Sequence, residues 1–160
     1  MLEVGQPAPP FSLQSDTDET VSLDDLKGRP VVVYFYPKDD TPGCTRQACS
    51  IRDSWAEFGR IGANVIGVSP QSPESHRKFK AKYGLPFPLL ADTEHTMAED
   101  YGVWVEKKNY GKTYMGIERS TFVIDADGNL AAIKRRVKPD EHTASWALGE
   151  VARLGDAART

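Results

Sequence analysis

The order of apolar runs and amphipathic stretches most constrains how this chain can fold. Residues 31–36, Val-Val-Val-Tyr-Phe-Tyr, form one continuous apolar run, and residues 64–69 form a second. Such runs are typical of strands covered on both faces. The stretch between them carries apolar residues at the spacing of one helical face: Cys44, Ala48, Ile51, Trp55 and Phe58. This region therefore predicts a strand–helix–strand unit whose helix ends near Gly59 or Gly62.

The rest of the chain continues the alternation. A helix is expected from Pro73 to Tyr83, with Ser72 as its N-cap and Gly84 as its stop. The other expected elements are a β-hairpin at 11–13 and 20–23, a strand at 87–91, a helix at 93–101, a hairpin at 121–124 and 130–133, and a helix at 139–154. Residues 103–118 are less regular. We expect their large side chains to pack in the core, or alternatively near the site: Trp104, Tyr110, Tyr114 and Met115.

Parallel strand–helix–strand units followed by an antiparallel hairpin and a last helix describe a thioredoxin-like α/β fold. It would have a central mixed sheet flanked by helices and an N-terminal β-hairpin extension. The 160 residues suffice to bury one core, and no stretch rich in Pro, Gly or Ser divides them. We therefore expect residues 1–160 to form a single domain.

Composition excludes several classes of function. The net charge of −3 gives no general attraction to nucleic acid or anionic membranes, and the basic residues 134–136 are interpreted as a strand end. No segment approaches the length of a membrane span, and the N-terminus has no signal-peptide pattern. We expect a cytoplasmic protein, and in that compartment cysteines are more often catalytic or redox-active than structural.

The chain has two cysteines, Cys44 and Cys49, in the segment Thr-Pro-Gly-Cys-Thr-Arg-Gln-Ala-Cys at residues 41–49. The strand–loop–helix order places Cys44 at or near a helix N-terminus. Free N–H groups and the helix dipole stabilise an anion there, which lowers the pKa of a thiol and makes it a better nucleophile. The alternative is a pair of small core residues. Cys44 lies on the apolar face, whereas Cys49 points about 140° away from it.

The spacing of the cysteines limits how they could be joined. In a regular helix the Cα atoms of residues i and i+5 lie roughly 8–9 Å apart, beyond the ~7 Å limit for a disulfide. A bond between them would require the first turns of the helix to unwind. Such a bond suits a cycle in which it forms and breaks better than it suits a structural staple. The spacing also differs from Cys-x-x-Cys, which disfavours direct dithiol exchange as the main activity.

Other residues near the cysteines offer polar groups. Thr41 places a hydroxyl three residues before Cys44, and the backbone N–H groups of Gly43 and Cys44 could face a bound oxygen. Arg119 precedes the apolar run 121–124 and could reach the site from a neighbouring strand, where its fork would hold several acceptors. The alternative is a solvated surface position.

The three histidines, His76, His95 and His142, are scattered, and none falls with a cysteine at metal-ligand spacing. His76 and His95 lie in expected surface helices, so we expect solvated roles for them. We expect no metal and no other cofactor.

Two blocks of the sequence resemble the peroxiredoxins, specifically the Q-type or bacterioferritin comigratory protein group. The first is PKDDTPGCTRQACSIRD at residues 37–53, and the second is YGKTYMGIERSTFVID at residues 110–125. The likeness extends from about Gly5 to the C-terminal helix. None of the matched site positions departs from the pattern of the group.

The resemblance implies a thiol-specific peroxidase. Cys44 would be the peroxidatic cysteine, which attacks the O–O bond of a peroxide and becomes a sulfenic acid. Cys49 would be the resolving cysteine, which condenses with it to give an intramolecular Cys44–Cys49 disulfide. Unwinding of the first helical turns would then accompany each turnover.

The resemblance also implies roles for residues around the sulfur. Thr41 would hydrogen-bond to the thiolate or the peroxide, and Arg119 would stabilise the thiolate and polarise the oxygen being cleaved. Pro37 would shield the reactive cysteine. The backbone N–H groups of Gly43 and Cys44 would hold the substrate.

The implied partners are hydrogen peroxide, organic hydroperoxides, and thioredoxin or a similar dithiol reductant, with no nucleic acid and no membrane. Members of the group are often monomers. A different class of function is a redox sensor or chaperone that uses the same cysteine switch without rapid turnover. The complete set of Pro37, Thr41, Cys44 and Arg119 favours catalysis, because a sensor needs only a reactive, accessible thiol. A metallochaperone of this fold would need closer cysteines and a matched histidine.

Overall fold

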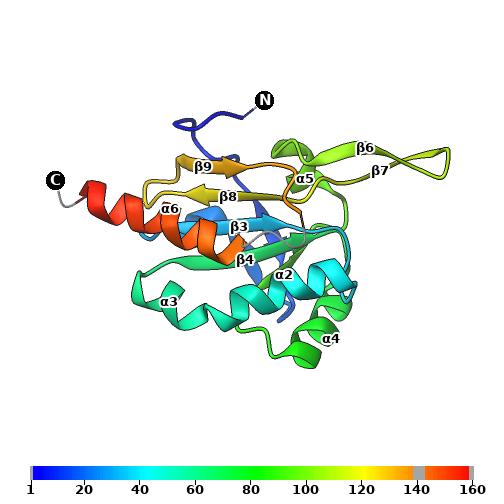
Figure 1. Cartoon of the computed structure of the whole chain (residues 1–160), viewed down its shortest axis with the longest axis horizontal. Coiled ribbons are helices and arrows are strands. Elements are labelled where there is room, and N and C mark those ends of the chain that lie inside the picture. Colours follow the sequence, from blue (N-terminus) through cyan, green and yellow to red (C-terminus); the bar gives the residue numbers. More distant parts are fainter. Residues whose placement is uncertain (1, 139–142, 159–160) are drawn as a thin grey trace.

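The computed structural model of the chain describes residues 2–138 and 143–158. Figure 1 shows their arrangement. The elements in chain order are β1 (Ser12–Gln14), β2 (Thr20–Ser22), α1 (Leu23–Leu26), β3 (Val31–Phe35), α2 (Pro42–Asp53), α3 (Trp55–Arg60), β4 (Asn64–Ser69), α4 (Pro73–Tyr83), β5 (Leu89–Ala91), α5 (Thr96–Asp100), β6 (Trp104–Asn109), β7 (Lys112–Ile117), β8 (Ser120–Ile124), β9 (Leu130–Lys134) and α6 (Thr143–Ala158).

A five-stranded mixed sheet forms the centre of the molecule, in the order β5-β4-β3-β8-β9. β3, β4 and β5 are parallel, whereas β8 runs antiparallel to both β3 and β9. Every residue of the middle strand β3 is buried, as its continuous apolar run predicts. The expected central mixed sheet with flanking helices is confirmed, and so is the N-terminal hairpin of β1 and β2.

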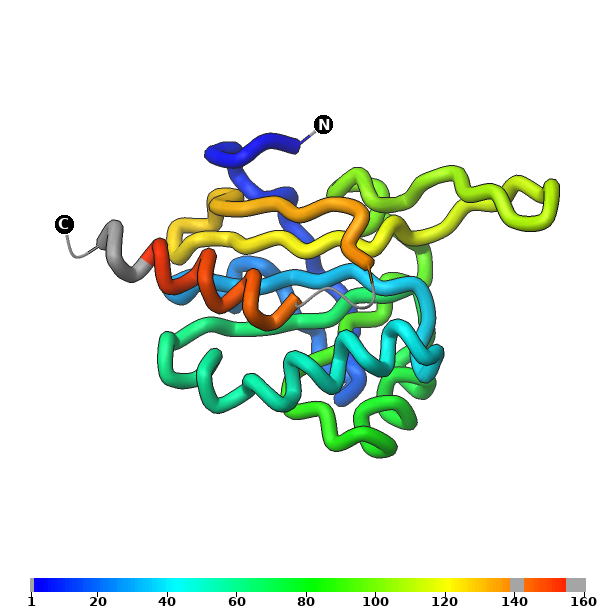
Figure 2. The backbone as a smooth tube through the Cα atoms, in the orientation of Figure 1, coloured from blue at the N-terminus to red at the C-terminus, as the bar shows by residue number. Residues whose placement is uncertain are grey.

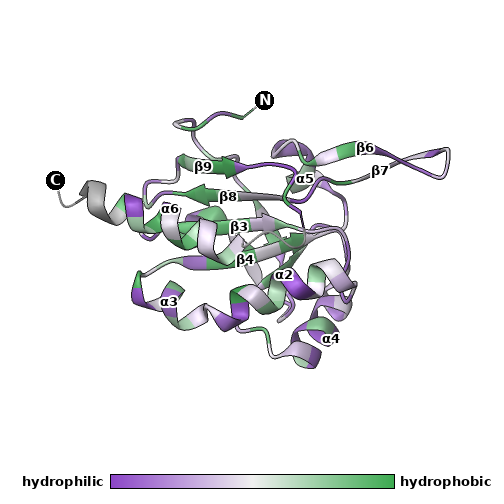
Figure 3. Cartoon of the chain, viewed as in Figure 1, coloured by the Kyte–Doolittle hydropathy of each residue, from purple (hydrophilic) through white to green (hydrophobic). Residues whose placement is uncertain are grey.

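The two faces of the sheet belong to two cores. Because side chains alternate along a strand, Val32 and Tyr34 face α2, α3 and α6, whereas Val33 and Phe35 face α5 and the N-terminal segment. Figures 1 and 2 show α2 and α6 in front of the sheet and the N-terminal segment, in blue, behind it. In Figure 3 the hydrophobic residues gather on the strands, while α2 and α4 carry both hydrophobic and hydrophilic residues along their length.

The boundaries of α4 follow the sequence signals. The Ser72 hydroxyl accepts a hydrogen bond from the backbone N–H of Ser75 (3.1 Å), Pro73 opens the helix, and Gly84 closes it in the left-handed conformation with φ 62°. α6 starts at Thr143; its expected start at Pro139 and His142 both lie outside the described residues. α1 is absent from the sequence prediction because four residues are too few to show a periodicity.

The helix that carries the cysteines differs from its prediction. We expected one helix to about Gly59, but Ser54, at φ −101° and ψ 10°, separates α2 from α3. The N–H of Ser54 donates to the carbonyl of Ile51 at 3.1 Å, and such an i→i−3 bond tightens the last turn of a helix. Ile51 and Phe58 are both buried in one core, so the apolar spacing continues across the break.

The expectation that residues 103–118 pack in the core is wrong for three side chains. Among the described residues, β6 and β7 pair only with each other, and they form a hairpin that projects from the molecule (Figure 1). Tyr110 and Gly111 at its tip both have positive φ, as a two-residue type I′ turn requires. Tyr110 is 97% exposed, and Tyr114 and Met115 are about half exposed.

β9 ends at Lys134, which confirms the basic cluster as a strand end. β5 and α5 each begin two or three residues later than expected, the usual scale of error at element boundaries. Within the described ranges, no helix is both long and apolar enough to cross a membrane.

The close approach of Gly67 to Tyr34 gives a test of this packing. The two residues are register partners on β4 and β3, and a Cβ at Gly67 would lie 2.9 Å from Cζ and Oη of Tyr34. We predict that Gly67→Ala lowers the free energy of unfolding by about 1–3 kcal/mol, measured by urea denaturation. The control is Gly59→Ala in α3, where the space is open; it should cause no loss. Equal effects of the two changes would contradict this packing.

Candidate active site

Cys44 occupies the first turn of α2, directly after the loop that follows β3. Thr41 is the N-cap, and the first intrahelical bond runs from the N–H of Thr45 to the carbonyl of Thr41 (2.8 Å). The N–H groups of Gly43 and Cys44 therefore lie before the first intrahelical bond. The Cys44 side chain is 1% exposed. Its sulfur thus sits at the positive end of the helix dipole.

Arg119 contacts this sulfur. Its Nη2 donates to Sγ of Cys44 at 3.2 Å, and its Nη1 donates to Oε1 of Gln47 at 2.6 Å. The contact is possible because β8 begins at Ser120, which lies opposite Phe35 at the end of β3. The structure therefore brings together two residues that are 75 positions apart in the sequence.

Gln47 is a site residue that the sequence analysis missed. Its side chain is buried, accepts from Arg119, and donates through Nε2 to Oγ1 of Thr143 at 3.1 Å. This bond links the cysteine helix to the start of α6. The available signal was that Gln47 lies three residues after Cys44, beside the apolar stripe of the helix.

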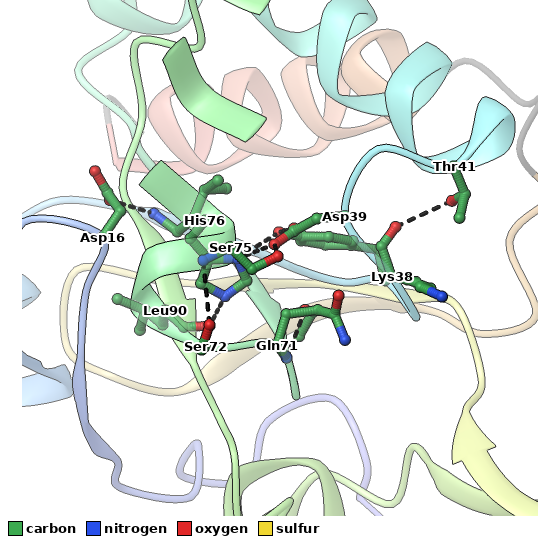
Figure 4. Close-up of polar contacts among 12 residues, drawn as sticks. Asp16, Lys38, Asp39, Thr41, Gln71, Ser72, Ser75, His76 and Leu90 are labelled. Carbon is green, nitrogen blue, oxygen red and sulfur yellow. Dashed lines mark hydrogen bonds and ion pairs between the residues drawn. The ribbon is translucent and has the colours of Figure 1, made fainter. Parts of the chain in front are cut away.

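Thr41 and Pro37 lie in or next to the loop between β3 and α2. The hydroxyl of Thr41 donates to the carbonyl of Lys38 at 3.0 Å (Figure 4), so its bond to the sulfur or to a peroxide stays a prediction. Pro37 is half-buried directly after β3, and its shielding role also stays a prediction.

The two cysteines are free thiols in this structure and differ in exposure. Cys44 is buried and Cys49 is half-buried, which confirms that the two sulfurs face different surroundings. Both lie on the regular helix α2, in which a direct bond between positions five apart is too long.

The surroundings of the sulfur are buried and include a further charged side chain. Burial raises the pKa of Tyr34, and the neighbouring Cys44 raises it further. Within the described part of the chain, the buried hydroxyls of Tyr34, Thr45 and Thr121 have no hydrogen-bond partner. On β6, burial and then the charge of Arg119 lower the pKa of Lys107. The ammonium group of Lys107, in the middle of β6, therefore lies close enough to interact with Arg119.

The expectation of a solvated His76 is wrong. His76 is fully buried, because it lies three residues before Phe79 on the face of α4 that packs inward. Its Nδ1 lies 2.7 Å from Oδ2 of Asp39, and its Nε2 lies 3.0 Å from the carbonyl oxygen of Leu90 (Figure 4). His95 is partly exposed and stacks on Trp104, with ring centroids 4.2 Å apart.

Two successive aspartates attach the loop before Cys44 to α4. Asp39 accepts from the hydroxyls of Tyr36 (2.6 Å) and Ser75 (2.7 Å) as well as contacting His76. Asp40, at φ 57°, accepts from Lys82 Nζ (2.8 Å) and from the hydroxyl of Tyr83 (2.6 Å). Among the described residues, no group of three His, Cys, Asp or Glu side chains is arranged to hold a metal ion.

Comparisons with known proteins agree with this fold and site. The AhpC/TSA family model matches residues 4–133. The chain is 56% identical to Peroxiredoxin Bcp of Bacillus subtilis over 143 residues, which cover 89% of this chain and 91% of the relative. It is 46% identical to Peroxiredoxin Bcp of Escherichia coli over 141 residues, which cover 88% and 90%.

Two solved structures show the same arrangement. The bacterioferritin comigratory protein of Xanthomonas campestris superposes with a TM-score of 0.88 at 34% identity, covering 95% of this chain and 99% of the other. A mutant of PrxQ from Xylella fastidiosa gives 0.90 at 31% identity, covering 97% and 98%.

The chain belongs to the AhpC/TSA family, whose members have a thioredoxin-like fold. Within that family it is similar to the peroxiredoxins of the bacterioferritin comigratory protein group, enzymes that reduce peroxides. The family and fold that the sequence predicts are thereby confirmed.

The attachment of Asp40 to α4 predicts a dependence of stability on pH. The hydrogen bonds from Lys82 and then Tyr83 hold the pKa of Asp40 below its ordinary value of 3.8. A lowered pKa in the folded state stabilises the fold above that ordinary value, and the stabilisation is lost as the pH falls through the folded-state pKa.

We therefore predict that Asp40→Asn lowers the urea midpoint of unfolding at pH 7 and that its difference from the wild type disappears at a pH well below 3.8. Unfolding curves over a pH series provide the measurement. Asp127→Asn, which removes an exposed carboxylate from the turn between β8 and β9, is the matched control. A difference for Asp40→Asn that is independent of pH would contradict the prediction.

Proposed function

We propose that this protein is a thiol peroxidase in which the thiolate of Cys44 reduces hydrogen peroxide and organic hydroperoxides. The observation that carries the proposal is the contact of 3.2 Å between Nη2 of Arg119 and Sγ of Cys44 at the start of α2. The sulfur attacks one peroxide oxygen and the O–O bond breaks. The thiolate, the hydroperoxide and one proton yield a sulfenic acid and an alcohol, or water from hydrogen peroxide.

The groups around the sulfur fit this step. The N–H groups of Gly43 and Cys44 point out of the first helical turn, where they can donate to the peroxide oxygens. Arg119 can stabilise the negative charge on the sulfur and on the departing oxygen with one planar fork. Thr41 would add a hydroxyl bond to the thiolate or peroxide, and Pro37 would limit the access of water.

Cys49 would complete the oxidative half of the cycle. Its thiol attacks the sulfenic sulfur of Cys44, the S–O bond breaks, and a Cys44–Cys49 disulfide and water are formed. Because the two cysteines lie on one regular helix, the first turns of α2 have to unwind before the sulfurs can meet.

A dithiol protein such as thioredoxin would return the enzyme to its starting state. Its two thiols supply two electrons and two protons, so that Cys44 and Cys49 become thiols and the reductant becomes a disulfide. Cys49 is the more exposed of the two cysteines, which supports Cys49 as the sulfur that the reductant attacks first. The resemblance to the group supports a monomer as the working unit.

We predict sustained NADPH consumption when the protein is mixed with thioredoxin, thioredoxin reductase, NADPH and hydrogen peroxide. Cys44→Ser should abolish it, because no nucleophile remains. Cys49→Ser should consume one equivalent of peroxide and leave a sulfenic acid on Cys44, detected by mass spectrometry with a sulfenic-acid trap. Full thioredoxin-linked turnover by Cys49→Ser would rule out its resolving role.

The same assay separates the peroxidase from the alternative function. A wild type that forms one stoichiometric disulfide with peroxide but is not reduced again by thioredoxin would favour a redox sensor, or an enzyme with another reductant. A panel of other dithiol reductants then distinguishes these two possibilities.

Arg119 should act in the reaction with peroxide. We predict that Arg119→Ala lowers the second-order rate constant for peroxide by roughly 10²–10³-fold, the scale for loss of one preorganised donor. Arg119→Lys keeps a charge but loses the fork, so it should lie between alanine and the wild type. Stopped-flow fluorescence measures the rate constant. An unchanged value for Arg119→Ala would remove Arg119 from the reacting site.

A further inference from the structure

We propose that the buried Asp39–His76 pair is a latch that holds the start of α2 in its peroxide-reactive arrangement and thereby sets the balance between peroxide reduction and disulfide formation. This proposal rests on the proposed function of Cys44 and Cys49. It makes His76 a positioning residue, because the ring lies on α4 and contacts the loop before Cys44 through Asp39.

The carboxylate of Asp39 is the centre of the latch (Figure 4). Asp39 is 7% exposed. Its carboxylate contacts the hydroxyl of Tyr36, directly after β3, at 2.6 Å. It also contacts two groups on α4, the Ser75 hydroxyl at 2.7 Å and Nδ1 of His76 at 2.7 Å. A buried carboxyl group with three partners is costly to pull away, because each lost partner leaves a buried polar atom unpaired.

His76 joins this carboxyl group to the sheet. Its Nε2 lies 3.0 Å from the carbonyl oxygen of Leu90 on β5. A carbonyl oxygen only accepts, so Nε2 donates to it, and Nδ1 is the ring nitrogen that contacts Oδ2 of Asp39. Both ring nitrogens are therefore used, and the ring connects the loop before Cys44 to the edge of the central sheet.

The position of the latch explains why it acts on α2. Asp39 lies five residues before Cys44, and α4 also holds the far end of the same helix, where Nη1 of Arg52 donates to the carbonyl of Tyr83 at 2.8 Å. Both cysteines lie between these two attachments. Asp40 is a second, exposed attachment at this end, whereas Asp39 is the buried one. Release of Asp39 loosens the loop that positions the first turns of α2, which are the turns that have to unwind before Cys49 can reach Cys44.

The latch therefore has opposite effects on the two chemical steps. The attack on peroxide needs the folded first turn, with Arg119 in contact with the sulfur. Disulfide formation, in which Cys44–SOH and the thiol of Cys49 give a disulfide and water, needs the unwound form. A second peroxide competes for the same folded sulfenic acid and converts it to a sulfinic acid, releasing an alcohol or water. A weaker latch favours the disulfide in this competition.

Two substitutions of His76 separate the latch from general packing. His76→Gln can place an amide near Nε2 and keep the bond to Leu90, but it loses the bond to Asp39. His76→Asn can place an amide near Nδ1 and keep the bond to Asp39, but it loses the bond to Leu90. Both variants replace the ring with a smaller amide, and their urea midpoints provide the measure of general destabilisation.

The experiment follows single-turnover oxidation by stopped flow and mass spectrometry. For His76→Gln we expect disulfide formation to be about tenfold faster, the shift that follows from loss of one hydrogen bond to a charged group. The peroxide concentration that gives half sulfinic acid should rise by a similar factor, and the rate of the first attack should not rise. His76→Asn should resemble the wild type. Ser75→Ala, which removes a smaller part of the latch, should shift the same ratio in the same direction.

The proposal is overturned if His76→Gln and His76→Asn change the disulfide-to-sulfinic ratio equally, or if neither His76→Gln nor Ser75→Ala changes it while the wild type reacts normally. A wild type that does not react with peroxide at Cys44 would instead overturn the proposed function. The two failures are distinguishable because the first needs an active wild type.

Discussion

The contact between the guanidinium of Arg119 and the sulfur of Cys44 is the interaction on which the site depends. Neither residue is placed by its own element alone. Cys44 needs the turn from β3 into α2, and Arg119 needs β8 to lie beside β3. The antiparallel pairing of these two strands therefore brings the charge to the thiol. Gln47 then fixes the other arm of the guanidinium and ties it to α6 through Thr143.

The helix that carries the cysteines has to satisfy two requirements that conflict. The reactive arrangement needs an intact first turn, whereas a bond between positions 44 and 49 needs that turn to open. α4 contacts the helix segment near both of its ends, through Asp39 and Asp40 on one side and Arg52 on the other. The fold would thus confine the change to a short stretch and leave the central sheet and the core on its other face intact.

Sequence alone predicted the features that depend on local signals. The apolar runs correspond to β3 and β4, and Ser72, Pro73 and Gly84 mark the start and the end of α4. The buried polar residues were missed because their partners are distant: His76 contacts Asp39 37 positions away, and Gln47 contacts Thr143 96 positions away. The exposure of Tyr110, Tyr114 and Met115 was missed, because the sequence does not show that β6 and β7 pair with no other strand among the described residues.

The two attachments of α2 to α4 also bear on how quickly the enzyme can be ready for another cycle. The stretch between Asp40 and Arg52 has both ends held by α4, so its ends need not be brought together again when the helix refolds. Helices of such length form in about a microsecond or less, whereas enzymes commonly turn over about 1–10³ times per second. Recovery of the helix after reduction would then be too fast to limit the cycle.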